Sequence, residues 1–156
     1  LMSDQKISLL EKRVIEAQAV APLIIAFGRE VGLEKAKAIV QRKNEEASRE
    51  YGRRCAATKG SNTMADLARE VAAWGKGNVI EKEMLEQSER TYAFKVISCG
   101  YADRYKALGI LEFGYCLSCC RDEPFVQGFN PNIKLKRTQT IMEGAPFCDF
   151  HYTLQD

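Results

Sequence analysis

Residues 133–141, Ile-Lys-Leu-Lys-Arg-Thr-Gln-Thr-Ile, alternate between two sets of side chains. Every second position is occupied by Ile133, Leu135, Arg137, Gln139 and Ile141, and Lys or Thr lies between them. This two-residue period predicts a β-strand, whose side chains point alternately to opposite faces of a sheet. The turn Glu143-Gly-Ala-Pro146 and a further strand over 147–154 follow, so the region is predicted to form a β-hairpin.

An earlier hairpin is expected at residues 78–85 and 91–98, which are β-like and joined by the polar turn Glu-Gln-Ser-Glu-Arg. Between the two hairpins, residues 100–108 return to helical spacing and end at Gly109. Residues 111–129 have apolar side chains that share one broad face, which predicts a single second helix.

The first half of the chain has the three- and four-residue spacing of amphipathic helices. A stripe over 7–24 is interrupted by Pro22, which we expect to kink the helix or to start a second one, and Gly32 is the expected stop. Residues 33–51 form the next helix, and its Lys, Arg and Glu residues are interpreted as a solvated face. A capping pattern, Thr63 with Asp66, begins a third helix that ends at Gly75.

This order of elements predicts an α+β fold. The N-terminal helices are expected to pack on a small antiparallel sheet formed by the two hairpins, with two helices between the hairpins. We expect one domain over residues 1–156, with a helical part at about 5–75 and a cysteine-rich hairpin, helix and hairpin part at about 78–156.

The composition is that of a globular protein, with 156 residues, 46% hydrophobic and 28% charged. The net charge of +2 is small and mixed in sign, so we expect no nucleic-acid partner. No apolar run approaches the roughly 20 residues of a spanning helix, so no membrane partner is expected. No signal peptide is recognised at the start of the sequence, so we expect a cytoplasmic protein with its six cysteines reduced. The sequence does not determine an oligomeric state.

Thiols and carboxylates between residues 99 and 151 are the main reactive groups. His151 is the only histidine, and the sequence contains no nucleophile elbow, phosphate loop or dinucleotide motif. Cys116-x-x-Cys119 and Cys148-x-x-His151 resemble a zinc site as text. A strand over 147–154 would place Cys148 and His151 on opposite faces, which disfavours that site.

A more informative set lies on three separate predicted elements. Cys99 ends a strand, Cys119 and Asp122 share a helix face, and Cys148, followed by Asp149, begins the last strand. We expect Cys99, Cys119, Asp122 and Cys148 to line one cavity.

The part of the chain from about Phe94 to Tyr152 resembles the L-2-amino-thiazoline-4-carboxylic acid hydrolase family. The resemblance rests on Val96-Ile-Ser-Cys-Gly-Tyr101 with Tyr105 and Leu108-Gly109, on Cys119-Cys-Arg-Asp122, on Phe129-Asn-Pro131, on Arg137-Thr-Gln-Thr140 and on Gly144-Ala-Pro-Phe-Cys-Asp-Phe150. Cys116 and Cys120, beside the matched Cys119, depart locally from the pattern and leave open which thiol acts there.

The resemblance implies a hydrolase that opens a small ring containing sulfur and nitrogen and yields an N-carbamoyl-cysteine type of product. The implied catalytic residues are Cys99, Cys119, Asp122, Cys148 and Asp149. The implied contacts to a small-molecule substrate are Arg137, Tyr101 and Thr140. For Arg137, a contact to the substrate carboxylate and an ion pair with a protein acid are equally compatible with the sequence.

Two mechanisms remain open from the residues. In the first, no cofactor is needed, and Cys99 attacks as a thiolate whose pKa is lowered by the helix that follows it, while Asp122 or Asp149 moves protons. In the second, Cys99, Cys119 and Cys148 hold zinc, which supplies a hydroxide. The alternatives to an enzyme are a metal- or redox-responsive module that binds a small ligand, and a catalytically inactive relative.

Overall fold

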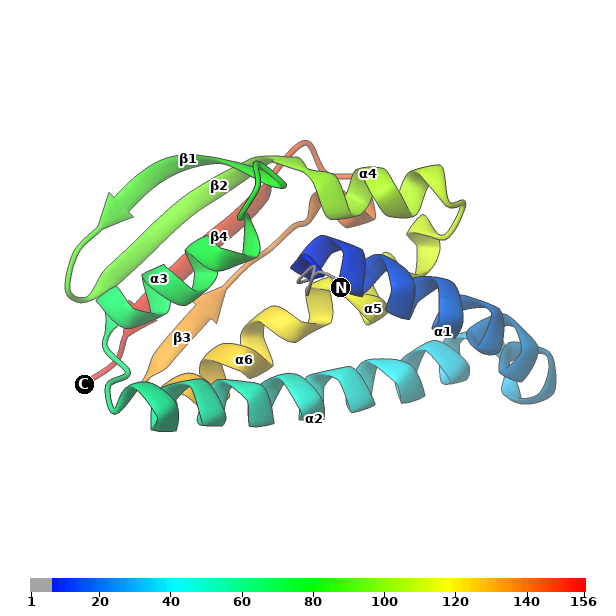
Figure 1. Cartoon of the computed structure of the whole chain (residues 1–156), viewed down its shortest axis with the longest axis horizontal. Helices are drawn as coiled ribbons and strands as arrows, with labels where there is room; N and C mark the ends of the chain where they lie inside the picture. Colours follow the sequence, from blue (N-terminus) through cyan, green and yellow to red (C-terminus); the bar gives the residue numbers. More distant parts are fainter. Residues whose placement is uncertain (1–6) are drawn as a thin grey trace, which may run out of the picture.

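Two long helices begin the described part of the chain. The computed structural model describes residues 7–156. Helix α1 (Leu9–Val31) and helix α2 (Leu33–Lys59) are joined at Gly32, and α2 runs back beneath α1 (Figure 1). Gly32 has φ of 91°, a value that glycine adopts without a steric penalty, and it confirms the predicted stop.

Pro22 lies inside α1 and does not start a second helix, so that part of the prediction is wrong. The apolar stripe explains why the helix continues through the proline. Val14, Ala17, Ala21 and Ile24, which lie on both sides of Pro22, are all buried. Their packing offsets the one backbone hydrogen bond that a proline removes from a helix interior.

Helix α3 (Met64–Trp74) begins with the capping box that the sequence predicts. The Thr63 hydroxyl accepts a hydrogen bond from the backbone N–H of Asp66, at 3.2 Å, and the Asp66 carboxylate accepts one from the backbone N–H of Thr63, at 3.0 Å. The helix ends at Gly75 as expected.

The first predicted hairpin is confirmed as strands β1 (Ile80–Gln87) and β2 (Thr91–Cys99), which pair antiparallel. Helix α4 (Gly100–Ala107) follows without an intervening loop, so Cys99 is both the last residue of β2 and the N-cap of α4. The chain then turns at Gly109, which has φ of 68°.

The segment predicted as one helix over 111–129 is broken into short pieces, so that prediction is wrong. These are the 3₁₀ turn η1 (Leu111–Phe113), helix α5 (Gly114–Leu117), the 3₁₀ turn η2 (Cys119–Arg121) and helix α6 (Asp122–Phe129). Ser118 leaves the helical region, with φ of −128° and ψ of −68°. Pro124 lies in the first turn of α6, and in a continuous helix its ring would clash with the carbonyl of Cys120.

The second hairpin forms, but its first strand is shorter than predicted. Its elements are β3 (Ile133–Lys136), the 3₁₀ turn η3 (Ile141–Glu143) and β4 (Cys148–Leu154). The strand ends at Lys136 because, beyond it, a side chain of β4 accepts the hydrogen bonds of the backbone N–H groups in place of a backbone carbonyl. The Asp149 carboxylate accepts hydrogen bonds from the backbone N–H groups of Thr138 and Gln139, both at 2.9 Å.

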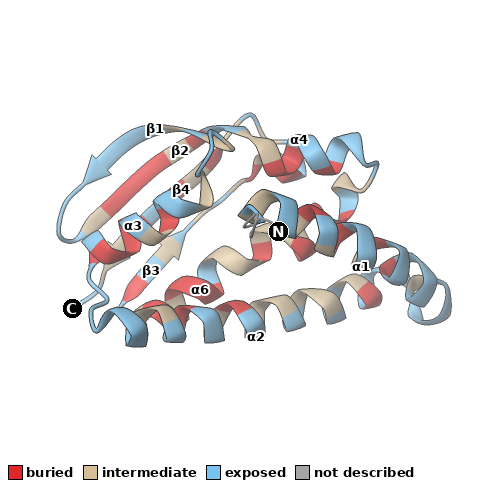
Figure 2. Cartoon of the chain, in the orientation of Figure 1, coloured by how far each residue is buried: buried red, intermediate tan, exposed pale blue. Residues whose placement is uncertain are grey.

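The four strands form one antiparallel sheet in the order β1-β2-β4-β3, which confirms the α+β class. Helices α3 and α6 contribute to the same hydrophobic core as the sheet, and α2 packs on α6 as the next layer (Figures 1 and 2). Largest among the fully buried side chains of this core are Phe94, Phe125, Phe129 and Tyr152.

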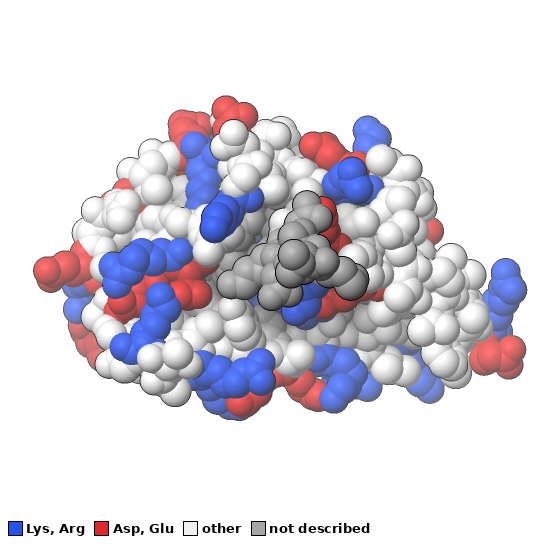
Figure 3. Space-filling view, in the orientation of Figure 1, with Lys and Arg blue, Asp and Glu red and all other residues white. Residues whose placement is uncertain are grey.

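A second core lies between α1, α2, α4 and α5 and includes Tyr101, Tyr105 and Phe113. Cys99 and Ile141 pack against both cores, so they mark the border between them. Acidic and basic side chains are interspersed over the face shown in Figure 3. Within residues 7–156, no helix has the length and apolar character needed to cross a membrane.

Candidate active site

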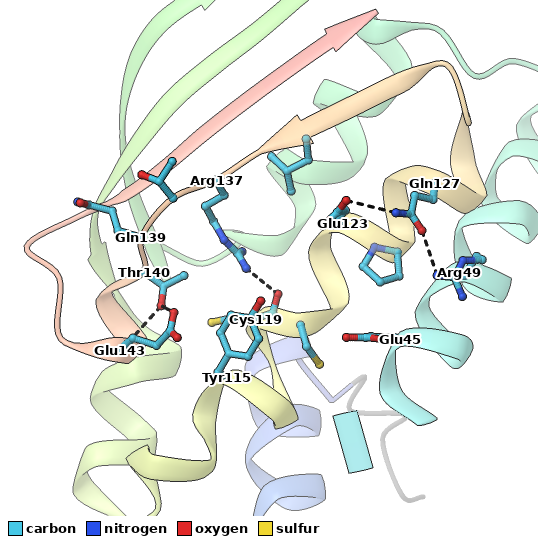
Figure 4. Close-up of a pocket in the computed structure, with 14 residues that line it drawn as sticks. Glu45, Arg49, Tyr115, Cys119, Glu123, Gln127, Arg137, Gln139, Thr140 and Glu143 are labelled. Atoms are coloured by element: carbon cyan, nitrogen blue, oxygen red, sulfur yellow. Dashed lines mark hydrogen bonds between the residues drawn. The ribbon is translucent and has the colours of Figure 1, made fainter. Parts of the chain in front are cut away.

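A pocket of about 390 Å³ lies between α2, the α5–α6 region and the connection from β3 to β4 (Figure 4). This volume lies within the range of small-molecule sites. Three of the predicted site residues, Cys119, Arg137 and Thr140, line it. The other lining residues are Glu45, Arg49, Tyr115, Cys120, Glu123, Pro124, Gln127, Leu135, Thr138, Gln139 and Glu143.

Arg137 is held by bonds on two of its nitrogen atoms. Nη1 forms an ion pair with Asp122, and Nη2 donates a hydrogen bond to the backbone carbonyl of Cys119 at 3.0 Å. The guanidinium also lies 5.2 Å from the ring centroid of Phe150 and 5.9 Å from that of Tyr115. Its side chain is only 9% exposed. Arg137 therefore joins the β3–β4 connection to the turn that carries Cys119.

Asp122 is not one of the residues that line the pocket. Burial raises the pKa of this carboxyl group, and the charge of Arg137 offsets part of the rise. The sequence allowed two partners for Arg137, a substrate or a protein acid, and in this structure the partner is the protein acid Asp122.

The three predicted thiols lie close enough to influence one another electrostatically, but only Cys119 lines the pocket. Burial raises the pKa of Cys119 well above its ordinary value, and negative charge on Asp122, Cys99 or Cys148 raises it further. Burial also raises the pKa of Cys148, to about 11. Cys148 Sγ accepts a hydrogen bond from the backbone N–H of Ile141 at 3.2 Å.

Cys99 has a raised pKa, which is the opposite of the lowered value that its place before α4 predicted. Burial is the largest influence on this thiol and raises its pKa, while the backbone N–H groups of Ala102 and Tyr101 lower it by less. Burial therefore outweighs the helix N-terminus here.

Two further predicted residues make structural contacts outside the pocket lining. The Tyr101 hydroxyl donates to the Trp74 carbonyl at 2.9 Å, and burial raises its pKa to about 12. Asp149 orders the start of the β3–β4 connection: besides its two backbone bonds, it accepts a hydrogen bond from the Thr138 hydroxyl at 2.5 Å. Burial would raise the pKa of Asp149, but these bonds outweigh it, and the pKa is lowered.

Thr140 is buried beside the pocket, and its hydroxyl donates to Glu143 Oε2 at 2.7 Å. This bond points the Glu143 carboxylate toward the same side of the pocket as Thr140 (Figure 4). The pocket lining thus includes a thiol, a carboxylate and a guanidinium, those of Cys119, Glu143 and Arg137.

Cys148 and His151 lie on opposite faces of β4, as predicted, since Cys148 is buried and His151 is exposed. Across residues 7–156, no three or more His, Cys, Asp or Glu side chains form a group that could hold a metal ion. Zinc on Cys99, Cys119 and Cys148 stays a prediction.

The family model for L-2-amino-thiazoline-4-carboxylic acid hydrolase matches residues 12–152. The chain belongs to this family. The match confirms the resemblance and extends it from the C-terminal part to nearly the whole chain, including α1, α2 and α3. Among curated proteins, none matches this member of the hydrolase family significantly.

The sequence reasoning missed the α2 side of this hydrolase-family pocket. Glu45 and Arg49 belong to a stretch interpreted as a solvated helix face, yet both line the pocket. A usable signal was the glycine at position 52, inside an amphipathic helix. A Cβ there would overlap the Phe125 carbonyl and lie 2.8 Å from the backbone nitrogen of Phe129, so only glycine allows α2 and α6 to approach this closely.

Proposed function

We propose that this chain is a cytoplasmic hydrolase that opens the ring of L-2-amino-thiazoline-4-carboxylate, or of a close relative, and releases N-carbamoyl-cysteine. One observation carries the proposal beyond the family's name. A pocket of small-molecule size is lined by a thiol, Cys119, a carboxylate, Glu143, and a guanidinium, Arg137. The six cysteines are free thiols, the state that a reducing compartment maintains.

The reaction needs a nucleophile for the ring carbon that lies between sulfur and nitrogen. We assign this role to Cys119, because it is the predicted catalytic thiol that reaches the pocket. Because its pKa is raised, Cys119 is a neutral thiol in the enzyme before substrate binds. Its proton is therefore transferred to the amidine nitrogen of the substrate as Sγ attacks, which also makes the carbon more electrophilic.

The covalent step forms a bond from Cys119 Sγ to the ring carbon and breaks the bond from that carbon to the ring sulfur. The proton moves on to the departing sulfur, which becomes a free thiol. Water then attacks the same carbon, and the bond to Sγ breaks. Glu143 takes one proton from the water and returns it to Cys119, while the second water proton goes to the substrate nitrogen that gave its proton to the departing sulfur. The product retains the oxygen as the carbonyl of a carbamoyl group.

In this scheme, Arg137 and Asp122 position the reacting groups and form no covalent bond with the substrate. The bond from Arg137 to the Cys119 carbonyl sets the turn that presents the thiol, and Asp122 holds Arg137 in place. We assign the guanidinium donors beyond these two bonds to hydrogen bonding with the ring nitrogen or sulfur as charge develops there during attack.

The test is incubation of the purified protein with L-2-amino-thiazoline-4-carboxylate, with mass spectrometry to detect a product heavier by one water molecule. We expect turnover by the wild type, a loss of at least about a thousandfold in Cys119→Ser, and no change in Cys55→Ser. Cys55 lies outside the pocket lining. A wild-type protein that forms no product would refute the proposal.

A chelator separates the thiol scheme from the zinc scheme. The thiol scheme predicts unchanged turnover in EDTA. Turnover that disappears with EDTA and returns with zinc would replace it by a metal site on Cys99, Cys119 and Cys148.

A further inference from the structure

Two cationic side chains line the pocket, Arg49 and Arg137, and they differ in what they already bind. Arg137 is paired with Asp122, and its side chain is 9% exposed. Arg49 makes no ion pair with any acid in residues 7–156. Its side chain instead donates a hydrogen bond to the neutral amide of Gln127, from Nη2 to Oε1 at 3.0 Å. The positive charge of Arg49 is therefore the one available to an anion in the pocket.

Gln127 fixes the direction of Arg49. The Gln127 Oε1 atom accepts from Arg49, while Nε2 of the same amide donates to Glu123 Oε1 at 3.3 Å (Figure 4). Because the oxygen and the nitrogen of this amide both form hydrogen bonds, the amide has one preferred orientation. It therefore holds the Arg49 guanidinium on the pocket side of α2. The close contact of α2 with α6 at Gly128 brings the two side chains together.

The two acids on this side of the pocket, Glu45 and Glu123, form hydrogen bonds with neutral amides and no ion pair with Arg49. Glu45 accepts a hydrogen bond from Gln41 Nε2 at 2.7 Å, and Glu123 accepts from Gln127. Arg49 lies on one side of the pocket and Cys119 near its middle (Figure 4).

We infer that Arg49, oriented by Gln127, is the residue that binds the carboxylate of the substrate, and that Arg137 is not. This inference deepens the proposed function and rests on it for the identity of the substrate. The planar guanidinium provides paired N–H donors for a carboxylate, and such charge-assisted bonds are among the stronger hydrogen bonds in proteins.

The experiment is calorimetric binding with a probe whose ring carbon between sulfur and nitrogen is saturated and therefore unreactive, so that no turnover interferes. L-thiazolidine-4-carboxylate has the same type of ring and the carboxylate, and its carboxamide is the neutral counterpart. Four proteins are compared: the wild type, Arg49→Gln, Gln127→Glu and Arg42→Gln. Arg42 is exposed on α2 outside the pocket, so its variant matches the loss of charge.

We expect the wild type and Arg42→Gln to bind the acid at least about tenfold more tightly than the amide, and Arg49→Gln to lose this preference. Gln127→Glu is the second variant. It pairs the charge of Arg49 with a carboxylate, so a carboxylate site at Arg49 predicts weaker binding of the acid and little change for the amide.

Acid binding that is unchanged in Arg49→Gln, or tighter in Gln127→Glu, would overturn the inference. A wild type that does not bind the acid, or does not distinguish it from the amide, would overturn it as well. The turnover assay tests the reaction independently. If the wild type opens the ring and Arg49→Gln opens it equally well, only the assignment of Arg49 is refuted. Loss of acid preference without ring opening supports the assignment and refutes the reaction.

Discussion

Gly128 on α6 and Arg49 on α2 approach so closely that a Cβ atom on the glycine would overlap the Arg49 carbonyl oxygen. Gly52 makes the reciprocal contact from α2, where a Cβ would overlap the Phe125 carbonyl. The two glycines thus bring the backbones of α2 and α6 into direct contact, and one wall of the pocket depends on this contact.

Gly128→Ala is expected to destabilise the protein by about 1–3 kcal/mol, because the added methyl group must push α2 and α6 apart. Helix propensity alone predicts the opposite sign, since alanine is favoured over glycine in a helix by about 1 kcal/mol. Urea unfolding of the variant and the wild type measures the difference. A stabilised Gly128→Ala would show that the two helices do not need the close contact.

Asp122→Asn is expected to destabilise the protein by about 3–5 kcal/mol, because it leaves the buried Arg137 without its ionic partner. The double variant Asp122→Leu/Arg137→Met removes both charges and should recover most of this loss. Unfolding free energies of the wild type, the single variants Asp122→Leu and Arg137→Met, and the double variant measure the coupling. Additive losses in the double variant would mean that the ion pair contributes little.

Alkylation of Cys119 by iodoacetamide should be slow in the folded protein at neutral pH, since burial raises the pKa of this thiol. The rate should continue to rise about tenfold per pH unit beyond the ordinary thiol pKa of 9.0, whereas in urea it should level off near that value. Peptide mass spectrometry follows each cysteine. Rapid modification of Cys119 at pH 7 in the folded protein would contradict the expectation and indicate a thiolate in the free enzyme.

Asp66→Asn is expected to destabilise the protein by about 1 kcal/mol at pH 7, because it weakens the cap of α3. Hydrogen bonds from Ser61 and Thr63 hold the pKa of Asp66 far below its ordinary value of 3.8. A lowered pKa stabilises the fold while the carboxylate is charged, so this contribution is present above about pH 4 and is lost as the pH falls. Thermal unfolding between pH 3 and pH 7 should therefore show the wild type and the variant converging in acid. A constant difference across this range would rule out the carboxylate charge as its source.

The sequence by itself determined the elements that depend on local interactions. The Thr63 and Asp66 cap, the stop at Gly32 and the alternation of Cys148 and His151 across β4 are all visible in residues close together in the chain. The period of the apolar residues was sufficient for the α+β class, because an element must bury one face to be stable. The family resemblance was also readable in the sequence, although from the C-terminal part alone.

Tertiary structure alone decided the properties that depend on distant neighbours. β3 ends at Lys136 because Asp149, on another strand, takes the backbone donors that would have continued the ladder. Arg49 became a pocket residue because the glycine contacts place α2 against α6, which follows it by about 70 residues. The pKa of Cys99 is raised because burial removes water from the thiol. Burial depends on how the whole chain packs, which local sequence patterns do not report.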